Sequence, residues 1–319
     1  MNRLASKGEN MKLIKWSSEV EKYELDEDYC IQKANLKEFS VHFAIYVIAE
    51  ENVLFRQSFD TSCSVLKEGD PCFYIEKNGS RIGGVLIEPN YMRYLFLQPP
   101  YGEEYYKVLI MLKRLLVNFS DNTRDIDVAW VKPWELKHYL RLGFRQEESR
   151  RCMIRPTETF NIKFEDKYET LAPSKTYITK IATLFKEAFA GGVGEDGQLS
   201  KGEYKEALMV YFKENAGEEI LETASTLIYD KETKEVIAAC LISLWEGWPN
   251  VYDIAVKPSY QGKGLASRMM KKALTVLKEE YPVVRLFVTL GNNAEALYYN
   301  LGFLPGTETT KLYIPAKDN

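Results

Sequence analysis

Two separated segments of the chain match two later segments at one constant spacing. Leu97-Gln-Pro-Pro-Tyr-Gly aligns with Val256-Lys-Pro-Ser-Tyr-Gln, and 256 − 97 is 159. His138-Tyr-Leu-Arg-Leu-Gly-Phe aligns with Leu297-Tyr-Tyr-Asn-Leu-Gly-Phe, and 297 − 138 is again 159. A shared offset over separate segments indicates a duplicated unit. The sequence therefore predicts two copies of one fold.

The order of expected elements is the same in both halves of the 319-residue chain. In the first half, we expect a helix at 35–58 that includes Leu54, a hairpin at 72–87 around Asn78-Gly79, strands at 91–97 and 126–131, and helices at 103–119 and 134–142. In the second half, we expect helices at 177–190, 203–214, 265–277 and 294–300, and strands at 226–229, 236–244, 251–256 and 283–289. We place the first unit at 1–155, a connection at 156–176 and the second unit at 177–319.

A strand, a glycine turn and a helix follow one another in the second copy. Pro258 ends the apolar strand, Gln261-Gly262-Lys263-Gly264 forms the turn, and Leu265 begins the helical periodicity. The first amides of a helix lack partners inside it, and glycines let an anion approach them closely. With Arg268 adding positive charge, this turn has the features of a pyrophosphate site.

Two motifs in this half resemble those of the GNAT family of acyl-CoA-dependent N-acyltransferases. The family signature Gln/Arg-x-x-Gly-x-Gly/Ala is matched by Gln261, Gly264 and Ala266. The later Leu-Tyr-x-x-x-Gly-Phe element is matched by Leu297, Tyr298, Gly302 and Phe303. The resemblance implies an α/β (α+β) protein of two tandem GNAT-like units, each a mixed, mostly antiparallel sheet flanked by helices.

The resemblance also implies an activity, which is transfer of the acetyl group of acetyl-CoA to an amine by direct attack, without a metal. The pyrophosphate-binding amides would be those of Gln261, Gly262, Lys263, Gly264, Leu265 and Ala266. The pantetheine would lie along Ile254, Ala255 and Val256, and an amide of Ile254 or Ala255 would polarise the thioester carbonyl. Asn292 resembles the family's cofactor-contacting asparagine, although its loop is one residue shorter than usual.

The reaction needs a proton donor for the leaving thiolate and a base for the incoming ammonium. Tyr298 matches the family's general acid, and its neighbour Tyr299 is the alternative. Glu246 is the preferred base, with Asp253 second because strand alternation predicts that it points away from the cleft. Cys240 lies in an apolar run, which predicts a buried and inert thiol.

The first copy differs at the positions that would bind the cofactor. Gly102, Tyr105 and Lys107 stand where the second copy has Gln261, Gly264 and Ala266. A tyrosine ring at the glycine position predicts a fold copy with a degenerate cofactor site. The alternative is that Tyr105 or Trp134 binds another ligand.

Composition limits the partners and the compartment. The net charge of −4 gives no basic field for nucleic acid, and neither a signal sequence nor a membrane helix is evident. Five scattered cysteines and two histidines argue against a metal centre or a disulfide framework. We expect a cytoplasmic monomer or homodimer that acts on a small-molecule or peptide amine.

The acceptor amine and two rival functions stay open. The expected acceptor-side residues are an aromatic wall of Trp245, Trp248 and Tyr252 and the carboxylates Glu195 and Asp196. One rival is a non-catalytic CoA-binding or regulatory protein that retains the fold. The other is an ATP-binding protein, against which the lack of Gly-x-x-x-x-Gly-Lys-Ser/Thr at the turn counts.

Overall fold

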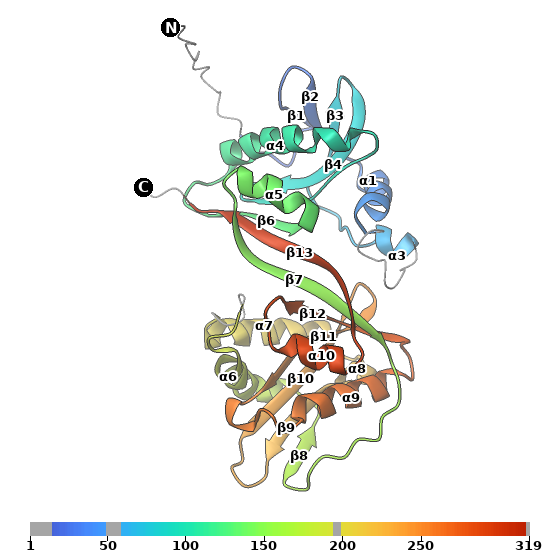
Figure 1. Ribbon diagram of the computed structural model, residues 1–319, viewed down its shortest axis with the longest axis vertical. Helices are drawn as coiled ribbons and strands as arrows, with labels where there is room; N and C mark the ends of the chain where they lie inside the picture. Colours follow the sequence, from blue (N-terminus) through green and yellow to red (C-terminus); the bar gives the residue numbers. More distant parts are fainter. Residues whose placement is uncertain (1–14, 49–58, 194–198, 317–319) are drawn as a thin grey trace. The chain divides into compact units, whose positions relative to one another are not determined.

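Contacts divide the chain into two compact units, and neither is one continuous stretch. The computed structural model describes residues 15–48, 59–193 and 199–316. Unit 1 comprises residues 1–50, 62–146 and 310–319, and unit 2 comprises 51–61 and 147–309. Each unit is a mixed sheet flanked by helices, which confirms the predicted fold class (Figure 1).

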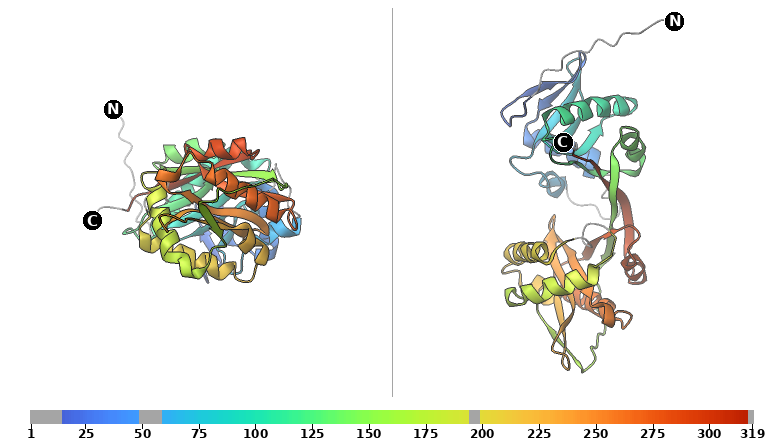
Figure 2. Two further views of the ribbon diagram at one scale, coloured as in Figure 1. Left: turned by 90° about the horizontal axis from the view of Figure 1, so that it is seen from below. Right: turned by 90° about the vertical axis from the view of Figure 1, so that its left-hand side faces the viewer.

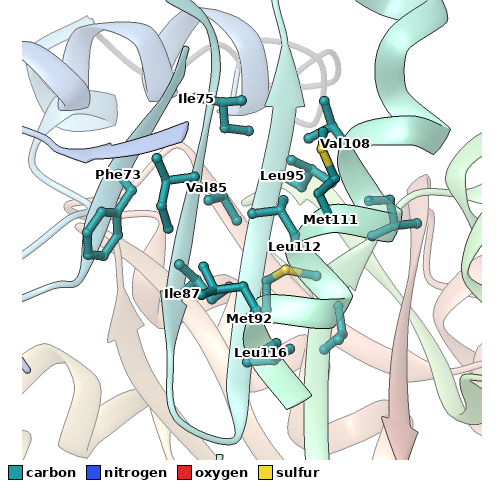
Figure 3. Packing of buried hydrophobic residues seen from close by; sticks show 14 of the residues in the cluster. Phe73, Ile75, Val85, Ile87, Met92, Leu95, Val108, Met111, Leu112 and Leu116 are labelled. Atoms are coloured by element: carbon teal, nitrogen blue, oxygen red, sulfur yellow. The ribbon is translucent and has the colours of Figure 1, made fainter. Parts of the chain in front are cut away.

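Unit 1 is built on a mostly antiparallel sheet. Its elements are β1 Lys22–Glu24, β2 Tyr29–Lys33, α1 Leu36–Phe43, β3 Cys72–Lys77, β4 Ser80–Glu88, β5 Tyr91–Leu97, α4 Tyr105–Phe119, β6 Ile126–Val131 and α5 Pro133–Arg141, with α3 Phe59–Cys63 at the unit boundary. The strand order is β1-β2-β3-β4-β5-β6-β13, where β13 is Leu304–Ile314, and within it β5 and β6 are parallel. Helix α4 packs apolar side chains on β3, β4 and β5, as Figure 3 shows. The hairpin turns at Asn78 and Gly79, as predicted, with φ of 50° and 73°.

Unit 2 repeats this plan. Its elements are β8 Tyr168–Leu171, α6 Ile178–Phe189, α7 Lys201–Glu214, α8 Glu219–Ala224, β9 Thr226–Asp230, β10 Val236–Trp245, β11 Trp248–Val256, α9 Leu265–Leu277, β12 Val283–Thr289 and α10 Ala294–Asn300. The strand order is β7-β12-β11-β10-β9-β8, and within it β11 and β12 are parallel. One face of the sheet packs on α6 and α7 and the other on α9, so the sheet lies between two helical layers (Figure 2).

The long strands β7 (Arg145–Pro156) and β13 (Leu304–Ile314) complete the sheets of the opposite halves. β7 pairs antiparallel with β12 over seven positions, from Val283↔Pro156 to Thr289↔Arg150. The end of β13 pairs antiparallel with β6, from Thr310↔Val131 to Ile314↔Ile126. Each unit therefore takes one strand from the sequence half that builds the other unit.

Several elements were not expected from the sequence. Neither β7 nor β13 was predicted, because charged and polar residues on both faces hide the strand alternation. β8 lies inside the predicted connection and pairs with β9, and α8 was also missed. The helix expected at 35–58 is an α-helix to Phe43 and a π-helix from Ala44 to Ile48, while Leu54 lies outside the described residues.

Candidate functional site

A β-bulge shapes the central strand of unit 2. Leu241 pairs with Asp253 and Ile242 pairs with Val251, so Tyr252 is an extra residue on β11. An extra residue breaks the two-residue alternation of a strand and re-aims the side chains that follow it. The expectation that alternation alone decides where Asp253 points therefore does not apply here.

β11 and β12 pair only at the beginning of their shared length. Register pairs join Asn250 to Arg285 and Val251 to Leu286, although β11 continues to Val256 and β12 to Thr289. Parallel strands that part in this way leave main-chain groups available to an extended, peptide-like ligand. The predicted pantetheine residues Ile254, Ala255 and Val256 all lie on this part of β11.

The glycine turn joins the end of β11 to α9. Gly262 and Gly264 have φ of 74° and 73°, and Gly264 is the N-cap of α9 without a side-chain cap. A Cβ atom added at either glycine would meet no heavy atom within 4 Å. Glycine is thus required here by backbone conformation, and the space beside the helix N-terminus is open. This geometry fits a bound diphosphate.

Polar side chains shape and charge the same turn. Gln261 donates its side-chain amide to the Val256 carbonyl at 3.2 Å, which ties the turn to the end of β11. The Lys263 ammonium donates to the Ser259 carbonyl at 3.1 Å and lies over the Tyr260 ring. Arg268 donates to the Lys263 carbonyl at 3.3 Å. Two cationic side chains therefore accompany the first amides of α9.

Tyr298 is buried on α10, with 5% of its surface exposed. Its ring packs edge-on against Phe303, with the centroids 5.9 Å apart. Burial raises the pKa of the Tyr298 phenol well above its usual value near 10, and Cys240 and Asp253 raise it further. Tyr298 thus keeps its proton at neutral pH and lies close enough to Asp253 to feel its charge. Tyr299 is 52% exposed, so the two neighbours have different environments.

The two candidate bases differ in position, because Glu246 precedes β11 and Asp253 lies within it. Glu246 lies in the turn before the strand, with φ of 50°, and forms an ion pair with Arg285 at 3.6 Å. The two side chains are 13% and 8% exposed. Asp253 lies five residues after Trp248, the first residue of β11, which corresponds to about 17 Å along a strand. Asp253 raises the pKa of Tyr298 less than burial and Cys240 do, and Glu246 is the partner of a buried guanidinium.

The remaining predicted site residues have varied surroundings. Cys240 is fully buried as expected, and burial raises the pKa of its thiol to about 12. Asn292 accepts a hydrogen bond from the Ala294 amide at 2.9 Å, so its side chain caps the start of α10. Trp245 stacks on Arg285, whereas Tyr252 packs on Tyr211 and donates to the Ala207 carbonyl. Glu195 and Asp196 lie outside the described residues.

The corresponding turn of unit 1 has Tyr105 at the position of Gly264, and its one glycine, Gly102, stands at the position of Gln261. Tyr105 begins α4 and is 3% exposed, with its ring against Trp134, which is half exposed. Glu104 precedes it and accepts hydrogen bonds from Tyr29 at 2.7 Å and from Lys77 at 2.5 Å. Unit 1 therefore has a buried ring and an acidic residue at the helix start where unit 2 presents bare backbone, although the carboxylate does not cap the helix amides.

Two absences hold for the residues that the structure describes. No group of three or more His, Cys, Asp and Glu side chains among them could hold a metal ion. None of the helices described is both long and apolar enough to cross a membrane.

Comparison with known proteins identifies the family of unit 2. Residues 181–303 match the model of the acetyltransferase (GNAT) family, so this part of the chain is a GNAT domain. The match contains β11, the glycine turn and Tyr298. No curated protein sequence matches the chain.

Solved structures extend the fold comparison to both units. A GCN5-related N-acetyltransferase from Sphaerobacter thermophilus has 12% identity and a TM-score of 0.64, covering 93% of this chain and 98% of its own. A tandem GNAT protein from the clavulanic acid biosynthesis pathway has 9% identity and a TM-score of 0.55, covering 92% and 100%. A GNAT-family acetyltransferase from Colwellia psychrerythraea has 11% identity and a TM-score of 0.54, covering 90% and 99%. The chain therefore has a tandem GNAT fold.

Proposed function

We propose that unit 2 binds acetyl-CoA and transfers its acetyl group to an amine by direct attack. The observation that carries the proposal is the parting of β11 from β12, in the unit that also contains the open Gly262–Gly264 turn and the buried Tyr298. Acetyl-CoA, when bound, supplies an activated acyl group. Its diphosphate would lie at the amides of Gln261 to Ala266, and its pantetheine would lie along Ile254 to Val256.

Each catalytic role is assigned to a group in unit 2. The main-chain amide of Ile254 or Ala255 donates a hydrogen bond to the thioester oxygen, which stabilises the charge that develops there. Tyr298 holds a proton at neutral pH and donates it to the leaving sulfur. The acceptor amine attacks from the other side of the parted strands after losing its own proton.

We propose Asp253 as the group that accepts this proton, ahead of Glu246. Asp253 lies at the bulge of β11 and acts electrostatically on Tyr298. Glu246 is committed to Arg285, at the turn that precedes β11. A base must lie within hydrogen-bond reach of the amine, directly or through one water. Asp253 fits this requirement better because it lies where β11 and β12 have already parted.

The experiment has a binding arm and a turnover arm. Calorimetric titration of acetyl-CoA into the full chain should show one site. Release of free thiol in the presence of a panel of amines should then identify an acceptor. Tyr298→Phe should lower kcat by about 10²- to 10⁴-fold, the usual range for a general acid, and leave the Kd for acetyl-CoA unchanged. The matched control is Tyr299→Phe, at the exposed neighbour.

The arms separate this proposal from its rival. Binding without turnover by any amine would support a non-catalytic CoA-binding protein that retains the fold. Loss of turnover in Tyr299→Phe but not in Tyr298→Phe would move the acid to the neighbouring residue. No binding of acetyl-CoA by the wild-type chain would refute both functions.

A further inference from the structure

One face of β7 is directed at the helix that carries Tyr298. Alternation along the strand places Arg151, Met153 and Arg155 on the same face. Met153 is fully buried in the apolar cluster that also contains Tyr298 and Phe303. The two arginines flank this contact. β7 thus presents one apolar and two cationic side chains to α10 and its surroundings.

Arg155 is held at the C-terminal end of α10. Its Nη1 donates to the carbonyl of Leu301, which is the C-cap residue of the helix. Its Nε donates to the Pro156 carbonyl at 2.9 Å, and its Nη2 pairs with Glu158 at 2.6 Å. The side chain is only 7% exposed. A cation at this position satisfies a carbonyl that the helix cannot and complements the helix dipole.

The Arg155 guanidinium also contacts the support of the Tyr298 ring. It lies 6.0 Å from the centroid of Phe303, the ring that packs on Tyr298, and 5.3 Å from that of Phe160. Gly302, with φ of 83°, has open space except for the Arg155 guanidinium about 3.9 Å from where a Cβ would be. Arg155 therefore contacts both the end of the helix and the ring beneath Tyr298.

Arg151 reaches the other end of the same helix. It forms an ion pair with Glu295, in the first turn of α10, at 3.4 Å, and it also binds Glu308 on β13. Helix α10 has only 7 residues, a length at which an isolated helix is not stable in water. Its position therefore depends on contacts at its ends, and β7 provides contacts at both.

We propose that Arg155 is a positioning residue for Tyr298, so that β7, a strand from the first half of the sequence, sets the geometry of proton donation in unit 2. This inference rests on the proposed function in so far as it concerns turnover. Its structural part, the fixing of α10 by Arg155 and Arg151, stands independently and is measurable without a known acceptor.

The test uses full-length chains carrying Arg155→Met, Arg155→Lys and, as the matched control, Arg150→Met. Arg150 is on the same strand, faces the opposite side and pairs with Glu148. In Arg155→Met, hydrogen exchange of residues 294–303 should accelerate about 10-fold or more, because a charge-assisted hydrogen bond is lost. Exchange in α9 should stay at the wild-type rate.

Turnover and rescue distinguish positioning from general stability. In Arg155→Met, kcat should fall about 10-fold while KM for acetyl-CoA changes less than about twofold, because the glycine turn is untouched. Arg155→Lys should recover part of the lost turnover and part of the lost exchange protection. A lysine ammonium keeps the charge but cannot bond all three acceptors that the planar guanidinium reaches. Arg150→Met should leave the exchange of 294–303 unchanged.

The outcomes are separable from those of the proposed function. Unchanged exchange at 294–303 in Arg155→Met would overturn the inference even if acetyl-CoA binds. If Arg155→Met does not fold, Arg155→Lys decides the question by the same local exchange measurement. Equal acceleration across α9 and α10 in Arg155→Lys would also overturn it, because the effect would then be global. Absence of acetyl-CoA binding by wild type would refute the proposed function alone.

Discussion

The two units begin their equivalent helices in opposite ways. At an offset of 159 residues, Glu104 and Tyr105 of unit 1 stand where unit 2 has Lys263 and Gly264. Unit 1 fills the position with a buried ring and has a partly exposed carboxylate before it, whereas unit 2 leaves it open with two left-handed glycines. One copy of the fold thus fills with its own side chains a place that the other copy leaves open.

The comparison shows what a helix start can be used for. The unpaired amides of a helix N-terminus attract negative charge from any source. In unit 1 the N-cap residue Glu104 brings negative charge to the helix start, although its carboxylate bonds Tyr29 and Lys77 and not a helix amide. In unit 2 Lys263 stands at the position of Glu104 and brings no negative charge, so the proposed source is a ligand.

The largest effect should come from removing the ring of unit 1. Tyr105→Ala should lower the free energy of unfolding by about 3–5 kcal/mol, the usual range for truncation of a buried aromatic side chain. Urea denaturation of the full chain measures it. Tyr299→Ala, at a residue that is 52% exposed, should cost much less. Equal costs at the two positions would contradict a packing role for Tyr105.

The reverse change should act on binding in unit 2. Gly264→Tyr should weaken acetyl-CoA binding at least about 100-fold, because it adds a ring in the open space and strains a left-handed residue. Calorimetry measures the Kd. Gly217→Tyr is matched for backbone strain, with φ of 88° and no atom within 4 Å of a Cβ. Similar weakening in that control would show that strain, not blockage, is responsible.

The two candidate bases, Asp253 on β11 and Glu246 in the turn before it, should differ in their effect on rate. Asp253→Asn should reduce kcat by about 100-fold, since a positioned base contributes at least that much. Glu246→Gln should reduce the rate far less but lower the melting temperature, because it removes the negative charge that pairs with the buried Arg285. Steady-state kinetics and thermal unfolding of both variants measure the two effects. The opposite ranking of rates would restore Glu246 as the base.

The smallest effect concerns acid stability in unit 1. Hydrogen bonds from Lys77 and then Tyr29 lower the pKa of Glu104 below its usual 4.5. Its stabilising contribution is therefore complete above the unfolded-state pKa and is lost as pH falls through the folded-state value. Wild type should lose more thermal stability than Glu104→Gln between about pH 5 and pH 3. Parallel pH profiles would indicate that the contact is neutral.

Predictability from sequence followed the strength of local signals. β5, β6 and β12 were placed to the residue because apolar runs end at turn residues. The glycine turn and the helix after it were also evident. The sequence does not predict β7, because Arg151 and Arg155 occupy inward-facing positions where a strand usually has apolar residues. These arginines contact α10, which lies about 140 residues later in the sequence. The bulge at Tyr252, which bears on the choice of base, also depends on a pairing that the strand itself does not reveal.

The exchanged strands have a consequence for synthesis on the ribosome. The sheet of unit 1 places Thr310 against Val131, and 310 − 131 is 179 residues of intervening chain. Chains emerge at about 5–20 residues per second, so β6 waits roughly 10–35 s for its neighbour. During that interval an uncovered strand edge can pair with other chains. The order of translation thus makes the first unit to emerge wait for the second, and a nascent chain halted before residue 310 should need chaperone protection.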